Sequence, residues 1–404
     1  MANTINTIKD GPGVFAKGIA ETLRDNLVFC AKVDKADASD FDGKNGFKSG
    51  DRIYTSIPPR YVPQQDNLDI TSLSGDTVEE KKPLVLNKTE TVRMTFDSLE
   101  LATDVDIAQA LKRYGIPAAE SIAQNMEARC LEIAKNKTYN LVGTPGSNAF
   151  TVADILAART KLNQNLCRPG NRFLVMNSES GADAVDARKG LFQSATNIAE
   201  QYREGMIGRA DGFDWFETEL VATHTNGADV TGAAINDVAV AEGASTLTVD
   251  GLSAAPTEGT VFTIAGVFMV HPITKAVTNR LQQFVVGAGA TTTSIPVTPS
   301  LYAASGGLQN ISALPADDAA LTFVGAASTG YVQNLAVHPS AFKMVTAPLY
   351  APKGVDLVAT QTVDGITVNL VRDFDVLTRE VITRIDVLYA FDPVRPEWSV
   401  RLTA

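Results

Sequence analysis

The chain has 404 residues, more than one ordinary hydrophobic core needs, so we expect two domains or one large domain that carries an insertion. Hydrophobic residues make up 45% of the sequence and charged residues 20%, a composition typical of a globular protein and not of a disordered one. The formal net charge of -11 argues against a surface that binds nucleic acid or an anionic membrane as a whole, because phosphate groups repel it.

The three cysteines, Cys30, Cys130 and Cys167, are far apart and odd in number. We therefore expect no disulfide framework, and a reducing compartment fits. Residues 1–18 contain no continuous apolar stretch, which argues against a secretory signal. Since no run of 18 apolar residues occurs, no transmembrane helix is predicted, and the expected location is the cytoplasm.

The N-terminal segment is small, polar and rich in glycine up to residue 13, which predicts a flexible arm. A helix is predicted next, because apolar residues recur every four positions. These residues are Phe15, Ile19, Leu23 and Leu27. Two interpretations of this helix stay open, packing on the protein's own core or packing on a neighbouring subunit.

A long polar loop is predicted between two strands. Residues 34–50 form a first loop, residues 52–57 a strand, and residues 91–96 a half-buried strand with clean alternation. From residue 60 to 88 the pattern is lost and polar side chains dominate. A loop of this length without a core of its own predicts an extended hairpin that needs a partner.

Two helices are predicted in the next segment. Thr103 with Asp106 is a capping pattern for the first, Gly115 is expected to end it, and Pro117 suits the first turn of the second. The second helix carries a narrow apolar stripe, which favours a spine lying across a sheet. The stripe consists of Ile122, Met126, Cys130 and Ile133, and the charged residues Glu120, Glu127 and Lys135 are expected to face elsewhere.

Residues 141–225 are predicted as α/β. Thr151 with Asp154 opens a helix, and the strand 173–176 is followed by a helix that Asn177 caps. The same strand-to-helix step recurs at residues 334–338, with a helix predicted through Val345. We expect the two strands to lie side by side in one sheet.

Residues 226–330 contain few charges and much Gly, Ala, Thr and Val, which predicts an inserted all-β module; a long, poorly ordered excursion is the alternative. Its strands are expected at residues 245–249, 261–264, 282–286 and 293–297. Three further strands are expected at residues 366–371, 381–388 and 399–402.

The sequence offers no constellation for catalysis. The three histidines, His224, His271 and His338, have no metal-pair spacing, and neither a Gly-x-Ser-x-Gly elbow nor a Gly-Lys-Ser phosphate loop occurs. We therefore predict no catalytic, cofactor-binding or metal-binding residue, no cofactor and no enzymatic activity. A structural protein that assembles with copies of itself is the expected class.

Several segments, in a shared order, resemble the podovirus-type coat proteins, the major capsid proteins of tailed double-stranded-DNA bacteriophages. The segments are LFQSATNIAEQYREGMIGRADGFDWFET (191–218), EGTVFTIAGVFMVHPITKAVTNRLQQFVV (258–286), NLAVHPSAF (334–342) and DPVRPEWSVRL (392–402). The resemblance implies an α+β tailed-phage major capsid fold with an inserted all-β barrel domain. It also implies a function, which is to form the icosahedral procapsid and then the mature head around the DNA.

The resemblance implies a domain plan of five parts. They are the N-terminal arm and helix (1–44), the extended loop (45–98), the peripheral domain with the spine helix (99–140 and 376–404), the axial domain (141–225 and 331–375) and the β-barrel insertion domain (226–330). The arm and the loop are expected to contact neighbouring subunits. The predicted interface residues are Phe15, Ile19, Leu23, Leu27, Leu68, Leu73, Glu79 and Lys81.

The implied partners are many copies of the chain in pentamers and hexamers, a portal protein, and packaged double-stranded DNA bound without sequence specificity; no membrane is involved. A separate scaffolding protein is expected, because residues 1–44 leave no room for the long helical scaffold region that some relatives carry. The implied location is the virion capsid, assembled in the host cytoplasm. The alternative is another self-assembling phage structural or decoration protein, or a β-rich surface adhesion protein.

Overall fold

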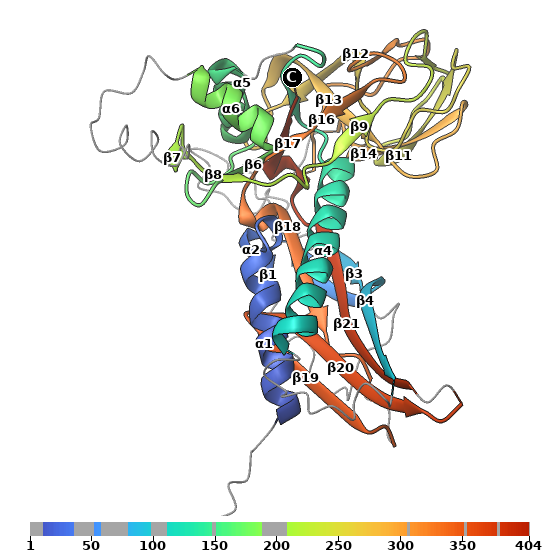
Figure 1. Ribbon diagram of the computed structural model, residues 1–404. Coiled ribbons are helices and arrows are strands. Elements are labelled where there is room, and N and C mark those ends of the chain that lie inside the picture. Colours follow the sequence, from blue (N-terminus) through green and yellow to red (C-terminus); the bar gives the residue numbers. More distant parts are fainter. Residues whose placement is uncertain are drawn as a thin grey trace, which may run out of the picture. The chain divides into compact units, whose positions relative to one another are not determined.

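The computed structural model describes residues 11–35, 52–57, 80–97, 111–147, 151–187, 208–304, 308–350, 354–377 and 380–403 (Figure 1). The chain divides into two compact units. Unit 1 comprises Met1–Thr55, Pro83–Cys130 and Lys343–Asp392, and unit 2 comprises Ser56–Lys82, Leu131–Phe342 and Pro393–Ala404. Both units combine helices with sheets, so the predicted α+β class is confirmed. Among the described helices, none has the length and apolarity needed to cross a membrane.

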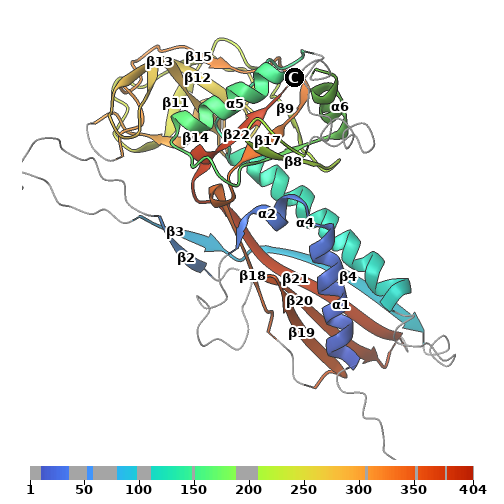
Figure 2. The same cartoon turned by 90° about the vertical axis from the view of Figure 1, so that its left-hand side faces the viewer.

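Unit 1 is built on a six-stranded sheet, whose long strands are visible in red and orange in Figure 2. Its strands in spatial order are β1 (Asp34–Lys35), β18 (Phe342–Ala347), β21 (Glu380–Pro393), β20 (Ile366–Asp375) and β19 (Leu357–Val363), with β4 (Lys88–Asp97) also paired to β21. The strands predicted at 91–96, 366–371 and 381–388 are therefore confirmed. In β4, Val92 and Met94 are partly buried while Thr91, Arg93 and Thr95 are exposed, which is the predicted alternation.

Helix α1 (Gly11–Asn26) packs on β19 and β20 of this sheet. The helix begins at Gly11, inside the segment predicted as a flexible arm. Ala16, Ile19, Ala20 and Leu23 are fully buried. A short helix, α2 (Phe29–Lys32), follows and continues into β1.

A two-stranded ribbon is formed by β2 (Arg52–Ile57) and β3 (Glu80–Val85). The strand predicted at 52–57 is confirmed, but its partner is β3 and not the strand at 91–96, which belongs to the large sheet. The ribbon also does not lack a core, because Ile53 and Leu84 pack in one cluster with Leu86, Val345 and Leu388. The rest of the predicted extended loop, residues 45–51, 58–79 and 98, lies outside the described residues.

Helix α4 (Ile116–Lys137) is the predicted spine helix, and a π-helical turn, Leu111–Gly115, leads directly into it. Ile122, Met126 and Cys130 are buried as predicted, and Ile133 is partly buried. Of the charged residues that were expected to face away from the stripe, Glu120 is exposed, whereas Glu127 and Lys135 are buried, at 1% and 6% exposed. The capping pattern at Thr103 lies outside the described residues.

The body of unit 2 is a mixed six-stranded sheet. Its strands in spatial order are β5 (Leu141–Val142), β22 (Ser399–Leu402), β17 (Asn334–Val337), β6 (Phe173–Met176), β8 (Phe213–Glu217) and β7 (Arg209–Ala210). The predicted neighbourhood of the strands at 173–176 and 334–338 is confirmed, and the two run antiparallel. A second, small ribbon pairs β9 (Thr223–Thr225) with β16 (Gly330–Val332).

The helices of this body follow the predicted capping patterns. Helix α5 (Val152–Gln164) begins at the capping box of Thr151 and Asp154, and α6 (Ser178–Asp186) begins at the cap of Asn177. The prediction of a helix through Val345 is wrong. One 3-10 turn, Pro339–Ala341, follows β17, and β18 then begins at Phe342 because the β-branched and aromatic residues there join the sheet of unit 1.

Residues 234–323 form a second six-stranded sheet in unit 2. Its strands in spatial order are β10 (Ala234–Ile235), β11 (Ala244–Asp250), β14 (Ser294–Leu301), β13 (Val277–Val286), β12 (Val261–Val270) and β15 (Leu321–Phe323). The bridge between Ala234 and Ala320, with a bond from the Leu321 N–H to the Ala233 carbonyl (2.8 Å), joins the first strand to the last and closes a barrel. The predicted strands are present, and the alternative of a poorly ordered excursion does not hold for these residues.

Aromatic side chains fill the barrel. Phe262 stacks on Phe284 with ring centroids 5.8 Å apart and lies 5.5 Å from Phe323. The barrel therefore has a hydrophobic core of its own, as an inserted domain needs.

Two boundaries of the predicted domain plan shift. Strands β19 and β20 were predicted in the axial part, but β20 pairs with β21 and both lie in unit 1. Strand β22 was predicted in the peripheral part, but it pairs with β17 and β5 in unit 2. Strand pairing decides both cases, and pairing between distant segments leaves no local signal in a sequence.

Candidate assembly surfaces

The three histidines have structural roles. The His271 and His338 Nδ1 atoms accept hydrogen bonds from backbone N–H groups two residues further on. His224 is buried, with Nε2 3.1 Å from the Thr260 hydroxyl. Burial and the nearby Arg401 and Lys135 lower the pKa of His224 to about 3. Within the described ranges, no group of three or more His, Cys, Asp and Glu side chains is arranged to hold a metal ion.

The apolar stripe of α1, which was predicted at a subunit interface, faces the protein's own sheet. Ile19 and Leu23 are fully buried and Leu27, just after the helix, is 5% exposed, so the protein's own residues cover these side chains. This is the packing of a core-facing helix, the other interpretation that the sequence left open. An interface role for this stripe stays a prediction.

The predicted loop residues are placed only in part. Lys81 is exposed on β3. Leu68, Leu73 and Glu79 and the side chain of Phe15 lie outside the described residues. In addition to Lys81, Tyr54 on β2 is an exposed residue of this ribbon. Among the described residues, β2 and β3 pair only with each other.

The turn between β20 and β21 carries an apolar surface that the sequence analysis missed. Phe374 is 46% exposed, Val376 77% and Leu377 93%. The Leu377 N–H donates to the Asp375 carboxylate at 2.8 Å, which holds the turn with its two aliphatic side chains outward. Three large apolar side chains in four residues at a hairpin tip are unusual for an isolated subunit, and such patches mark contact surfaces. We call residues 374–377 the apolar tip.

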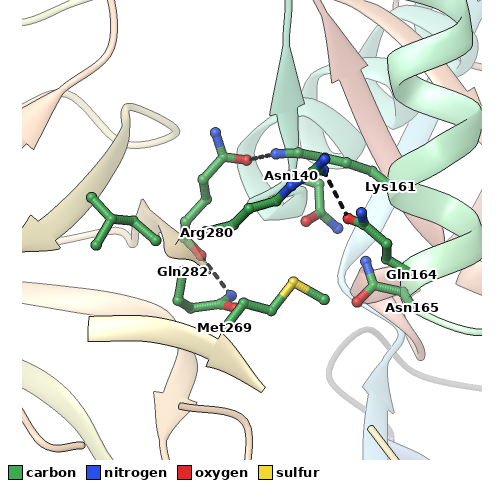
Figure 3. A pocket seen from close by; sticks show the side chains of 9 residues that line it. Asn140, Lys161, Gln164, Asn165, Met269, Arg280 and Gln282 are labelled. Carbon is green, nitrogen blue, oxygen red and sulfur yellow. Dashed lines mark hydrogen bonds between the residues drawn. The ribbon is translucent and has the colours of Figure 1, made fainter. Parts of the chain in front are cut away.

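A pocket in unit 2 lies between α5 and strand β13 of the barrel (Figure 3). Lys161 donates to the side-chain oxygen Oε1 of Gln283 and to the backbone carbonyl of Leu141 (2.9 Å), and Arg280 donates to Oε1 of Gln164 (3.2 Å). Burial and the charge of Arg280 lower the pKa of Lys161 to about 7. The lining is made of amides, two basic side chains, Met269 and Leu281, with neither a carboxylate nor a thiol. These hydrogen bonds hold the barrel against the body of unit 2. The residues that line the pocket include no nucleophile paired with a base.

Among curated proteins no match was found. Solved structures with similarity include a structure titled "Mycobacterium phage Che8" (14% identity, 93% of this chain and 90% of that chain covered, TM-score 0.46). Another is the capsid of Cyanophage P-SCSP1u (12% identity, 92% and 89% covered, TM-score 0.44). A third is the CUS-3 coat protein I-domain (28% identity, 22% and 93% covered, TM-score 0.18).

The family comparison spans almost the whole sequence. Residues 5–403 match the family described as P22 coat protein, gene protein 5. The match includes both units and the barrel, so it does not rest on one shared module. The resemblance read from the sequence is thereby confirmed, and the chain belongs to the P22 coat protein family.

Proposed function

We propose that this member of the coat protein family is the major capsid protein of a tailed bacteriophage and self-assembles into the icosahedral shell around its double-stranded DNA. The observation that carries the proposal is the family match over residues 5–403. The exposed apolar tip supports it physically, because an apolar patch of this kind is typical of a surface that binds another chain.

Weak contacts, repeated many times between such surfaces, suit the assembly of a closed shell. Full burial of one Val or Leu side chain contributes about 1.5–3 kcal/mol, so a tip of three apolar residues makes a contact of modest strength. Each subunit of a closed shell makes several such contacts at once, and their joint effect stabilises the shell although each contact alone is reversible. Reversible contacts let misplaced subunits dissociate during assembly.

The finer proposals concern partners and place. The subunits form pentamers and hexamers, a separate scaffolding protein directs their assembly, and a portal protein completes the head. The net charge of -11 suits a container that does not grip phosphate, so the packaged DNA is bound without sequence specificity. Assembly takes place in the host cytoplasm, and no enzymatic activity is part of the function.

The domain plan, with the structural boundaries, is also part of the proposal. Unit 1 is the peripheral domain with the N-terminal helix, the body of unit 2 is the axial domain, and the barrel is the insertion domain. The ribbon and the residues between its strands form the extended loop that contacts a neighbour, with Leu68, Leu73, Glu79 and Lys81 on it.

The test is assembly of the purified full-length protein, alone and with the scaffolding protein of the same phage, observed by negative-stain electron microscopy and sedimentation velocity. Closed shells or capsomer rings are the expected result. A monomer that persists in both samples would overturn the proposal and favour a decoration or adhesion protein.

A deletion in the loop sharpens this test. Removing residues 60–90 would delete Leu84 and Leu86, which are fully buried core residues, so a loss of assembly would be ambiguous. Removing residues 60–78 spares the described strands. The shortened chain is expected to keep the thermal unfolding midpoint of the wild type and to lose shell formation. Normal shells from the shortened chain would show that the loop makes no essential contact.

A further inference from the structure

Arg401 is a fully buried arginine whose guanidinium has no hydrogen-bond acceptor. It lies on β22, opposite Leu335 of β17 on one side and Leu141 of β5 on the other. Its exposed fraction is 0%, and Nε, Nη1 and Nη2 all lack a partner in the part of the chain that the structure describes. A native protein rarely leaves a buried polar group unpaired, and the free-energy cost is highest for a charged group.

The surroundings of Arg401 add positive charge. Ser399, two residues earlier and on the same face of β22, has its hydroxyl 2.8 Å from the Thr138 hydroxyl just after α4. This contact brings the end of α4, with Lys135, to the same face. The Lys135 Nζ atom donates to the Thr223 carbonyl at 3.3 Å, and the next residue of β9 is the buried His224. Three basic side chains from three elements therefore meet inside unit 2.

Acidic groups do not balance this charge. The pKa of Lys135 is lowered, mainly by burial and also by Arg401, although Glu132 and Glu258 act in the opposite direction. For Arg401 itself, burial lowers the pKa to about 9, and no carboxylate opposes this effect. At neutral pH the guanidinium therefore keeps its proton and its charge, whereas His224 is neutral. A second unpaired group follows in the sequence, since the hydroxyl of Thr403, two residues after Arg401 and just beyond the end of β22, is buried without a partner among the described residues.

We propose that Arg401 and Thr403 hold a small monovalent inorganic anion of the halide class inside the body of unit 2. The guanidinium and the hydroxyl both donate hydrogen bonds, which is the set of partners that a chloride or bromide ion accepts. A halide is favoured over phosphate because a fully buried site strongly penalises a second negative charge. The ion stabilises the packing of β22 against the end of α4 by neutralising the buried arginine.

Two measurements on the full-length protein test the proposal, with bromide as the probe. The first is the thermal unfolding midpoint in sodium bromide and in sodium gluconate at equal ionic strength. Bromide at 100 mM is expected to raise the midpoint by at least about 2 °C relative to gluconate. In Arg401→Met this difference should disappear, since the apolar side chain leaves no charge to neutralise. Arg159→Met, an exposed arginine of α5 in the same unit, is the control and should keep the difference.

The second measurement is anomalous scattering from crystals of the wild-type protein soaked in bromide. It decides the question even if Arg401→Met does not fold. A peak within hydrogen-bond distance of the Arg401 guanidinium is expected. Density without anomalous signal at that place would show bound water and overturn the proposal, as would equal midpoints in the two salts or a bromide effect that persists in Arg401→Met.

Discussion

The carboxylate of Glu127, in the middle of α4, accepts a hydrogen bond from the backbone N–H of Cys30 at 3.1 Å. It also accepts one from the N–H of Phe29. These are the first two residues of α2, whose N-terminal N–H groups have no partner within the helix, and the side chain of Val28 before them provides no cap. A residue on another helix thus supplies the cap and ties the N-terminal segment to the spine helix.

Removal of this carboxylate should destabilise unit 1. Glu127→Ala leaves two buried N–H groups unpaired and is expected to lower the free energy of unfolding by about 2–4 kcal/mol. Glu127→Gln keeps one side-chain oxygen as an acceptor, so one of the two N–H groups loses its partner and a loss of about 1–2 kcal/mol is expected. Urea unfolding of the full-length protein measures both values. Glu120→Ala, exposed on the same helix, is the control, and an equal loss in the control would contradict the capping role.

The same carboxylate gives the stability a pH dependence. Burial raises the pKa of Glu127 above its usual value of 4.5, against the opposing effect of the two N–H groups. The folded state therefore binds the proton more tightly than the unfolded state does. This contribution is complete below about pH 4.5 and is lost as the pH rises through the folded pKa. Relative to Glu127→Gln, the wild type is expected to lose stability over that rise; a constant difference would show that the pKa is not raised.

The sequence predicts those elements whose signal is local. Strands with alternation or β-branched runs, such as β2 and β20, and helices with a capping box, such as α5, were found in their places. The prediction of a helix through Val345 is wrong. Pro339 and Ser340 are a signal for the start of a helix, but strand pairing with distant segments overrides it, and residues 342–347 join a sheet. The partner of β2 could not be found, because β3 is a polar segment that strand pairing holds extended.

The candidate surfaces show the same limit. Glu127 and Lys135 were expected to face away from the apolar stripe of α4, and their burial could not be predicted, since helical periodicity gives the face of a residue but not what covers that face. The apolar tip did have a signal, because Phe374, Val376 and Leu377 interrupt a polar turn between two predicted strands. An apolar cluster in a turn is informative only when the strands on both sides are known to pair, as β20 and β21 do.

Gly143 is a position where a side chain cannot be accommodated. Its φ is +95°, and a Cβ atom built there would lie 1.9 Å from the Thr403 carbonyl oxygen. Since that oxygen belongs to backbone paired with the neighbouring strand, it cannot move aside cheaply. Gly143→Ala is expected to lower the free energy of unfolding by about 3 kcal/mol or more, measured by urea unfolding. Gly170→Ala, where nothing lies within 4 Å of the added atom, should change it by less than about 0.5 kcal/mol, and similar losses in both variants would refute the close approach.

The lowered pKa of Lys161 predicts a second pH dependence of the stability, opposite in sign to that of Glu127. Its pKa in the folded protein is about 7 against an ordinary value of 10.5, so the unfolded state binds more protons between these pH values. The stability of unit 2 is therefore expected to rise as the pH increases from 7 towards 10. Lys161→Met, which cannot ionise, should flatten this rise, while Lys137→Met, a change of a half-buried lysine at the end of α4, should not. Thermal unfolding midpoints across this range measure the effect, and an unchanged slope in Lys161→Met would place the proton elsewhere.

The apolar tip makes a prediction about assembly and not about folding. Val376 and Leu377 are 77% and 93% exposed, so the double change Val376→Asp with Leu377→Asp should alter the free energy of unfolding by less than about 0.5 kcal/mol. If neighbouring subunits cover the tip, two buried charges without partners should raise the critical concentration for shell formation at least about 10-fold. The matched control, Val376→Ile with Leu377→Met, keeps the surface apolar and should assemble like the wild type. Light scattering against protein concentration measures all three proteins, and equal critical concentrations would place the tip outside the subunit contacts.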